Sequence, residues 1–176
     1  GLPSDFSLSA GIKTPDGSWA VQPGDLADLK LVPANNFSGD VSFNVTAFST
    51  ENGTNASTTR ALTIHIAGIA DAPNLSSVPA NGAEGSEIPL LITSSLSHPN
   101  GTETFSIVIT NLPPGFSLSA GEVDAQGNWQ LSPGDLQGLN LITPDSYSGN
   151  FNISLKAISS EENTQAYTLG NLNVTI

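Results

Sequence analysis

Few side chains in this sequence are of a type that could carry out catalysis. There are two histidines and no cysteine, which excludes a thiolate nucleophile, a disulfide and a Cys-ligated zinc site. His65 lies in a segment that alternates like a β-strand, and His98 lies in a loop beside Pro99. Two histidines so far apart in the sequence do not make a zinc site. No serine stands in the Gly-x-Ser-x-Gly pattern of a nucleophile elbow, so we expect no enzymatic activity.

Carboxylates are the reactive groups that the sequence has in excess. It contains 16 acidic residues against four basic ones, for a formal net charge of −12. Nucleic acids and anionic membrane surfaces attract Lys and Arg, so neither is expected as a partner. The sequence has no run of about 18 apolar residues, so membrane insertion is not expected either. Carboxylates without basic partners indicate a solvated acidic surface or a site for divalent cations.

The sequence contains the same stretch twice. Two copies begin at Leu2 and Leu112 and run without a gap to Ile66 and Ile176, at an offset of 110 residues. A period this long suits an array of whole domains, because solenoid repeats span only ~20–50 residues. We therefore predict the C-terminal part of a truncated repeat over residues 1–70 and a complete repeat over residues 71–176.

Alternation of apolar and polar residues predicts β-strands in both copies. In the complete repeat they are expected over residues 75–78, 87–93, 104–110, 116–118, 129–131, 150–159 and 165–176. Pro89 is tolerable in its strand only at an edge or a bulge. About seven short strands separated by turns predict an all-β, immunoglobulin-like β-sandwich.

Three local features refine this prediction. Over residues 150–159, the side chains expected to face inward are Phe151, Ile153, Leu155 and Ala157. In the last strand the apolar positions shift from Tyr167 and Leu169 to Leu172 and Val174, which predicts a one-residue bulge near Gly170. The stretch Pro133-Gly134-Asp135-Leu136 predicts one helical turn capped by Asp135, as Asp25 would cap its counterpart.

The first copy lacks any counterpart of residues 72–111, which supply three strands of the complete repeat. Its apolar positions Val41, Phe43 and Val45 would therefore be left open, together with a strand edge. We expect residues 72–111 to pack onto residues 112–176. The truncated first repeat is then expected to fold poorly alone or to associate with another copy through its open face.

With these residues in view, the chain resembles the immunoglobulin-like or cadherin-like extender repeats of large bacterial RTX adhesins exported by type I secretion. The resemblance covers nearly the whole chain. It implies an extracellular protein of the bacterial cell surface, in which neighbouring repeats form a rod that holds a distal binding module away from the cell. It also implies calcium at the junctions between repeats. The matching residues are Ala70-Asp71-Ala72-Pro73, Gly85, Leu112-Pro113-Pro114-Gly115, Gly127-Asn128-Trp129, Pro133-Gly134-Asp135-Leu136 and Ser148-Gly149.

The resemblance also implies a set of calcium ligands. The acidic loop of the family corresponds here to residues 98–103, where His98 and Asn100 replace two aspartates and Glu103 remains. Together with Asp71 in the linker and Glu84 in the following loop, the implied interdomain site is Asp71, Glu84, Asn100 and Glu103. Calcium takes about six to eight oxygen ligands, so the competing interpretation is that these are solvated residues near a turn.

Two other functions remain open from the sequence. One is a carbohydrate-binding module in which Trp19 and Trp129 stack on sugar rings, although their position after a hairpin turn favours packing against the sandwich. The other is an accessory domain of a secreted hydrolase.

Overall fold

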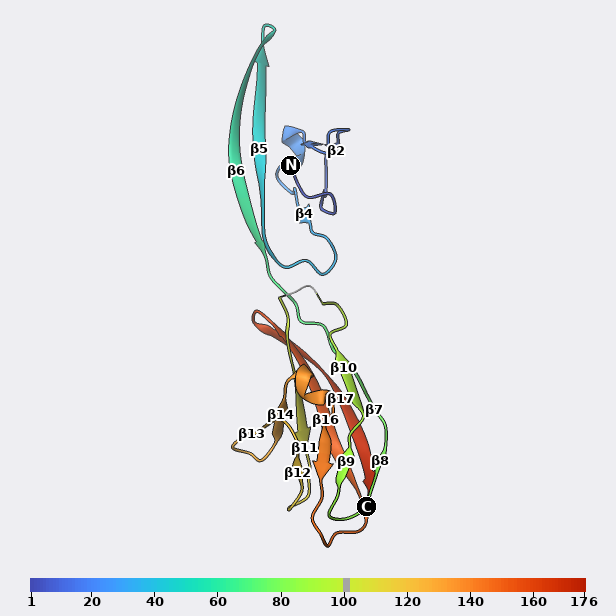
Figure 1. Ribbon diagram of the computed structural model, residues 1–176. Coiled ribbons are helices and arrows are strands. Elements are labelled where there is room, and N and C mark those ends of the chain that lie inside the picture. Colours follow the sequence, from blue (N-terminus) through green and yellow to red (C-terminus); the bar gives the residue numbers. More distant parts are fainter. Residues whose placement is uncertain (100–101) are drawn as a thin grey trace. The chain divides into compact units, whose positions relative to one another are not determined.

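The computed structural model describes residues 1–99 and 102–176 of the chain (Figure 1). The chain divides into two compact units, unit 1 (Gly1–Gly68) and unit 2 (Ile69–Ile176). This division falls two residues before the boundary that the sequence predicts after residue 70. The described residues form strands and turns arranged in several sheets, an all-β fold consistent with a β-sandwich.

The described residues of unit 2 form eleven strands, several of them only two residues long. They are β7 (Asn74–Ser77), β8 (Ala80–Asn81), β9 (Glu87–Pro89), β10 (Ile92–Ser95), β11 (Thr104–Thr110), β12 (Ser117–Leu118), β13 (Glu122–Val123), β14 (Trp129–Leu131), β15 (Asn140–Ile142), β16 (Asn150–Glu161) and β17 (Thr164–Thr175). The largest sheet has the order β13-β14-β11-β16-β17-β8, a second has the order β12-β15-β9, and β10 pairs with β7. β8, β9 and β11 therefore pair with strands of residues 117–175, and β7 and β10 pair with each other.

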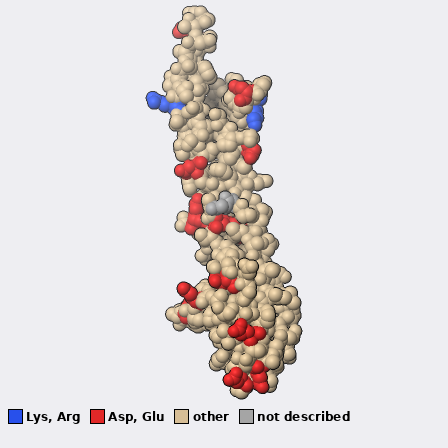
Figure 2. All heavy atoms as spheres, in the orientation of Figure 1, with Lys and Arg blue, Asp and Glu red and all other residues tan. Residues whose placement is uncertain are grey.

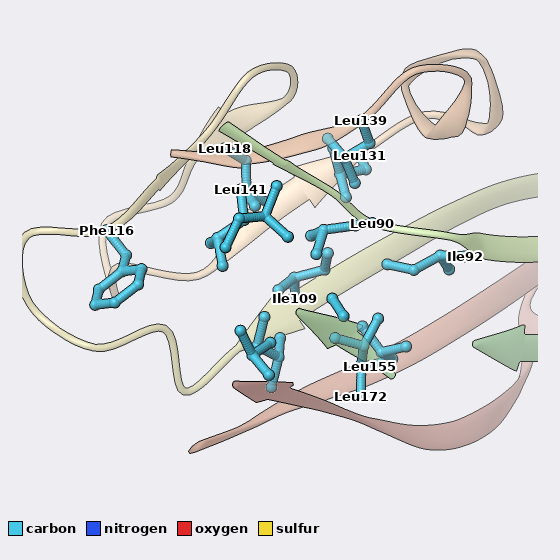
Figure 3. Close-up of a cluster of buried hydrophobic side chains, with 14 of the residues drawn as sticks. Leu90, Ile92, Ile109, Phe116, Leu118, Leu131, Leu139, Leu141, Leu155 and Leu172 are labelled. Carbon is cyan, nitrogen blue, oxygen red and sulfur yellow. The ribbon is translucent and has the colours of Figure 1, made fainter. Parts of the chain in front are cut away.

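The core of unit 2 lies between the six-stranded and the three-stranded sheet, as Figure 3 shows. Ile107, Ile109 and Leu155 come from the large sheet and are at most 1 % exposed. Ile88 and Leu141 come from the opposite sheet and are equally buried. Burying one such side chain stabilises a fold by about 1.5–3 kcal/mol, so this contact between the sheets is a main source of the stability of unit 2.

The long strand β16 confirms the predicted alternation. Ile153, Leu155 and Ala157 are buried and Phe151 packs against the core from a partly buried position. β16 pairs with β11 on one side and β17 on the other, so it lies in the middle of the large sheet. The inward face of β16 is therefore the one that the alternation predicts.

The predicted bulge in the last strand is wrong. β17 pairs residue for residue with β16 from Thr164 to Thr175, without interruption at Gly170. Tyr167 and Leu169 point outward and are 56 % and 68 % exposed. The inward position between them and Leu172 is Gly170, where an added Cβ would lie 3.0 Å from Leu75 Cδ2. Because Leu75 fills the space that an inward side chain would need, the strand keeps its register without a bulge.

The single strand predicted over residues 87–93 is divided. β9 ends at Pro89 and β10 begins at Ile92, and the two belong to different sheets. β9 is the edge strand of its sheet, where the missing N–H of Pro89 removes no pairing with a further strand. Ile88, Leu90 and Ile92 are all buried, so the predicted apolar face is confirmed although the strand breaks.

Unit 1 has strands at the same offset of 110 residues as unit 2. They are β1 (Ser7–Leu8), β2 (Ile12–Lys13), β3 (Trp19–Ala20), β4 (Leu31–Val32), β5 (Gly39–Glu51) and β6 (Thr54–Ile66). The hairpin β5–β6 pairs Asp40 with His65, as β16–β17 pairs Asn150 with Thr175. An edge-to-face aromatic pair also recurs, with ring centroids 4.9 Å apart for Phe6–Phe37 and for Phe116–Tyr147.

The expected helical turn forms in both units as a short 3-10 helix, η1 (Pro23–Asp25) and η2 (Pro133–Leu136). Asp135 takes part in capping η2 from the third residue of the turn. Ser132 precedes the turn, and its N–H and hydroxyl both donate to the Asp135 carboxylate at 2.7 Å. The Ser132 hydroxyl and backbone N–H together lower the pKa of Asp135. Asp135 is therefore an acceptor that caps the turn, as the sequence predicts.

Candidate functional site

The backbone of Asp71 is fixed at one end of unit 2. Its N–H donates to Glu103 Oε1 at 2.9 Å, and its carbonyl accepts a hydrogen bond from the Ser159 hydroxyl. Its carboxylate Oδ2 lies 3.3 Å from His98 Nδ1. The structure thus brings together two of the four predicted ligand residues, Asp71 and Glu103, and adds His98 from the loop.

Two further carboxylate features lie at this end. Glu161, the last residue of β16, is only 3 % exposed and accepts a hydrogen bond from the Thr102 hydroxyl. Glu103 Oε2 is buried and has no hydrogen-bond partner among the described residues. A buried carboxylate oxygen left unpaired is costly, so this atom is one that a cation or a water molecule would satisfy.

Glu84 lies at the opposite end of the same unit. It follows β8, which pairs with Val174 and Thr175 near the end of β17. The next residue, Gly85, donates its N–H to Pro144. Asp71 instead lies beside the start of β17, and eleven residues of strand at ~3.3 Å each separate the two ends by roughly 35 Å. Glu84 and Asp71 of one unit therefore cannot bind the same ion.

The described residues of unit 2 supply too few oxygen ligands for a complete calcium site. Asn100 lies outside the described residues. Over residues 1–99 and 102–176 no three His, Asp or Glu side chains converge closely enough to hold a metal ion. Calcium needs about six to eight oxygens. Asp71, Glu103 and Glu161 supply an acidic end to the unit but not, from the described residues, a full coordination shell.

The tryptophans do not form a shared platform within a unit, because each unit has one. Trp129 is partly buried and packs against the core of unit 2, with Ile109 opposite it on β11. Trp19 is partly buried, and its Nε1 atom has no hydrogen-bond partner in the part of the chain that the structure describes. The packing of Trp129 agrees with the sandwich interpretation.

His65 has an acidic neighbour that the sequence analysis did not anticipate. Its Nδ1 lies 2.8 Å from Asp40 Oδ1 across the β5–β6 hairpin. Both side chains are more than half exposed, at 60 % and 66 %. This pair is therefore a solvent-exposed contact between the two strands of the hairpin.

Sequence reasoning missed the carboxylates that organise the two short hairpins. Asp124 accepts four hydrogen bonds, from the backbone N–H groups of Gln126 and Asn128 and from the side chains of Asn128 and Gln130. In unit 1 the same role falls to Asp16, which Thr14 and Ser18 contact. The signal was present, because an aspartate shortly before a Gly favours such turns: Asp16 precedes Gly17 directly, and Asp124 lies three residues before Gly127. These carboxylates are structural.

Charged groups of both signs are sparse on the face of the molecule in Figure 2, and basic side chains are the rarer. No helix in the described part of the chain is long and apolar enough to cross a membrane. No protein-family model matches the chain, and no curated protein sequence matches it.

Proposed function

We propose that the chain is a structural extender segment of a bacterial cell-surface adhesin, built from tandem immunoglobulin-like or cadherin-like β-sandwich repeats. It has no catalytic role, and its partners are neighbouring repeats of the same protein outside the cell. The observation that carries the proposal is the 110-residue offset. Sequence, strand positions and hairpin register all recur at it, from Ser7–Leu8 matching Ser117–Leu118 to β5–β6 matching β16–β17.

The path of the chain through unit 2 supports a rod. Residues 70–82 run beside β17 in the same direction, with Ala70 bonded to Thr164 at the start and Gly82 bonded to Thr175 at the end. The chain therefore enters unit 2 at one end and leaves it at the other. Each unit of this kind adds its full length to an array, whereas a unit with adjacent termini would branch off from it.

The proposal is tested by the length of longer arrays. Proteins with one, two and three further copies of residues 67–176 are prepared, and their maximum dimensions are measured by small-angle X-ray scattering. A rod lengthens by a constant increment of roughly 35–45 Å per copy, the span of a twelve-residue strand with its turns. Maximum dimensions that grow much more slowly than the number of copies would mean that the repeats fold back on one another.

Tryptophan fluorescence distinguishes the rod from a carbohydrate-binding module. A sugar platform needs an exposed indole face, and Trp129 packs against the core instead. We expect its emission to resist iodide quenching and to stay unchanged in a panel of mono- and oligosaccharides, with Trp19→Phe used to isolate Trp129. A saturable change with one sugar would favour the binding module.

Calcium remains part of this proposal in a narrower form. Within one unit it involves the end that carries Asp71, Glu103 and Glu161, and Glu84 belongs to the other end.

A further inference from the structure

The outer face of the large sheet differs in charge from the rest of unit 2. Ten of the 16 acidic residues lie in residues 69–176, yet no side chain that points outward from β11, β16 or β17 is acidic. Lys156 is the one Lys or Arg of unit 2, and it lies on this face between Val108 of β11 and Leu169 of β17. The face therefore presents a single positive charge on a surface without carboxylates.

Tyr167 stands beside Lys156 on this face. Its side chain is 56 % exposed, and the Lys156 ammonium group lies 4.5 Å from the centroid of its ring. An ammonium group is attracted to an aromatic ring, so this contact favours one orientation of the exposed ring. Leu169, which is 68 % exposed, and the partly buried Ile158 continue the apolar surface. An exposed aromatic ring with a hydroxyl at its tip is a surface on which the C–H face of a sugar ring stacks.

Amide and hydroxyl side chains flank this apolar centre along the strands. Toward one end, Asn173 Nδ2 donates to Asn152 Oδ1 at 3.2 Å, and toward the other, Gln165 Nε2 donates to Ser160 Oγ at 3.1 Å. An amide side chain has two N–H donors and an accepting oxygen, so these exposed groups keep capacity for the hydroxyl groups of a ligand. The eight steps from Asn152 to Ser160, at ~3.3 Å each, span roughly 26 Å, enough for an oligosaccharide that lies along the strands.

The hairpin of unit 1 shows that the fold does not need these side chains. β5–β6 pairs along its whole length in the register of β16–β17. Where unit 2 has Lys156, Tyr167 and Leu169, unit 1 has three residues with small hydroxyl side chains, Thr46, Ser57 and Thr59. The three residues of unit 2 are also absent from its core. Binding therefore explains them better than folding does.

We propose that the outer face of β11, β16 and β17 binds an oligosaccharide that carries one carboxylate. Tyr167 stacks on a sugar ring, Lys156 pairs with the carboxylate, and the flanking amides bond to hydroxyl groups. The charge of the face selects this ligand, because one ammonium group matches one carboxylate. A nucleic acid or an anionic membrane would need several basic residues, and the net charge of −12 repels both.

Other occupants fit the face less well. An added β-strand is excluded from its centre, because β16 pairs on both sides and has no free edge. A second copy related by a two-fold axis through this face would bring two Lys156 ammonium groups toward each other, and like charges in close contact disfavour such a dimer.

The inference rests on the side chains of this face and not on the adhesin assignment. Trp129 lies on the inner face of the same sheet, opposite Ile109, so a ligand on the outer face leaves the emission of Trp129 unchanged. Array length tests the rod and carbohydrate binding tests this site, so either proposal can fail without the other.

The test begins with the whole 176-residue chain on an array of neutral, carboxylated and sulfated oligosaccharides. We expect the oligosaccharides that retain the chain to carry a carboxylate. The one that binds most tightly is then titrated into the isotope-labelled chain and followed by NMR. The amide signals that shift should belong to β11, β16 and β17. The same oligosaccharide with its carboxylate reduced to an alcohol should bind at least tenfold more weakly.

Three variants locate the binding. Lys156→Thr and Tyr167→Ser introduce the residues that unit 1 has at these positions, and each should weaken binding at least tenfold. Leu91→Thr changes a residue that is 63 % exposed outside this sheet, and it should leave binding within about twofold of the unmodified chain. Circular dichroism of all three variants should match that of the unmodified chain, because none of these side chains belongs to the core.

Four outcomes would overturn the proposal. They are an array on which no oligosaccharide retains the chain, equal binding of the reduced oligosaccharide, unchanged binding by Tyr167→Ser, and a dimer of the unmodified chain that Tyr167→Ser dissociates. The last would mean that a second copy covers this face.

Discussion

Asp124 is a partly buried carboxylate that holds the turn beside a two-residue strand. Its four hydrogen bonds tie the turn between β13 and β14, with the Asn128 N–H as the first contribution to its lowered pKa. In unit 1 the hydrogen bonds from Thr14 and Ser18 lower the pKa of Asp16 to about 2. A carboxylate held in this way favours its ionised form, so the folded hairpin and the charge stabilise each other.

Asp124→Asn should therefore change the stability of unit 2 in a pH-dependent way. A lowered folded-state pKa means that the ionised group stabilises the fold above its ordinary pKa of ~3.9, and that this stabilisation is lost as pH falls through the folded-state value. We expect the variant to melt below the unmodified chain at about pH 6 and to approach it near pH 2. Thermal unfolding followed by circular dichroism measures both. An equal difference at the two pH values would contradict the ionised role.

Calcium, if it binds, should act through Asp71. Ligand binding to the folded state alone stabilises by RT ln(1 + [L]/Kd), about 2.7 kcal/mol at a hundredfold excess over Kd. Melting curves in calcium and in chelator should then differ for the unmodified chain and for Glu84→Ala, and coincide for Asp71→Ala. Glu84→Ala is the matched control because Glu84 lies at the far end of unit 2. Coinciding curves for the unmodified chain would remove calcium from the proposal.

At the scale of elements, alternation was a reliable guide for β11 and β16. The bounds of β11 are those predicted, Thr104–Thr110, and the inward face of β16 is as expected. It was a poor guide for β17, where contacts with neighbouring segments decide which side chains point into the core. Tyr167 and Leu169 are apolar but lie outward, with the ammonium group of Lys156 4.5 Å from the centroid of the Tyr167 ring. No pattern within β17 reveals that Leu75 fills the space beside Gly170.

The register of β16 predicts a contrast between adjacent residues. Leu155→Ala should cost about 2–5 kcal/mol of unfolding free energy, because Leu155 is 1 % exposed in the core. Ser154→Ala should cost less than about 1 kcal/mol, since its hydroxyl contacts Asn111 and Asn171 at an exposed position. Urea denaturation of the two variants measures both values. Similar losses would mean that β16 is turned the other way in solution.

In the candidate site, the structure brings Asp71 and Glu103 together but places Glu84 at the other end of unit 2. Asp71 and Glu103 are brought together because the linker and the start of β11 lie at the same end of unit 2. Glu84 comes only thirteen residues after Asp71, yet the chain between them runs the length of β17. Closeness in sequence gave no information about distance here, because the connecting segment is extended.

At the scale of the whole molecule, the two units differ in which strands of the β-sandwich repeat they contain. Residues 72–176 contain every strand of unit 2, whereas residues 1–70 lack the strands that would cover β5 and β6. We expect residues 72–176 to fold alone, and residues 1–70 alone to be poorly ordered or to associate. Amide dispersion and solution mass of residues 72–176, 1–70 and 1–111 test this. A well-folded monomer of 1–111 beside a disordered 72–176 would move the boundary.

The parallel run of residues 70–82 beside β17 has a mechanical consequence. Tension between the ends of unit 2 pulls these two segments in opposite directions along their length, so the contacts at Thr164, Thr168, Asn171 and Thr175 are loaded together. Contacts loaded in shear must break at once, whereas those of a hairpin pulled at its open end break one after another. We expect unit 2 to unfold in single-molecule pulling as one abrupt event, and Thr168→Val, which removes the hydroxyl bonded to Pro73, to lower its force. Gradual lengthening would show that the termini do not bear the load in this way.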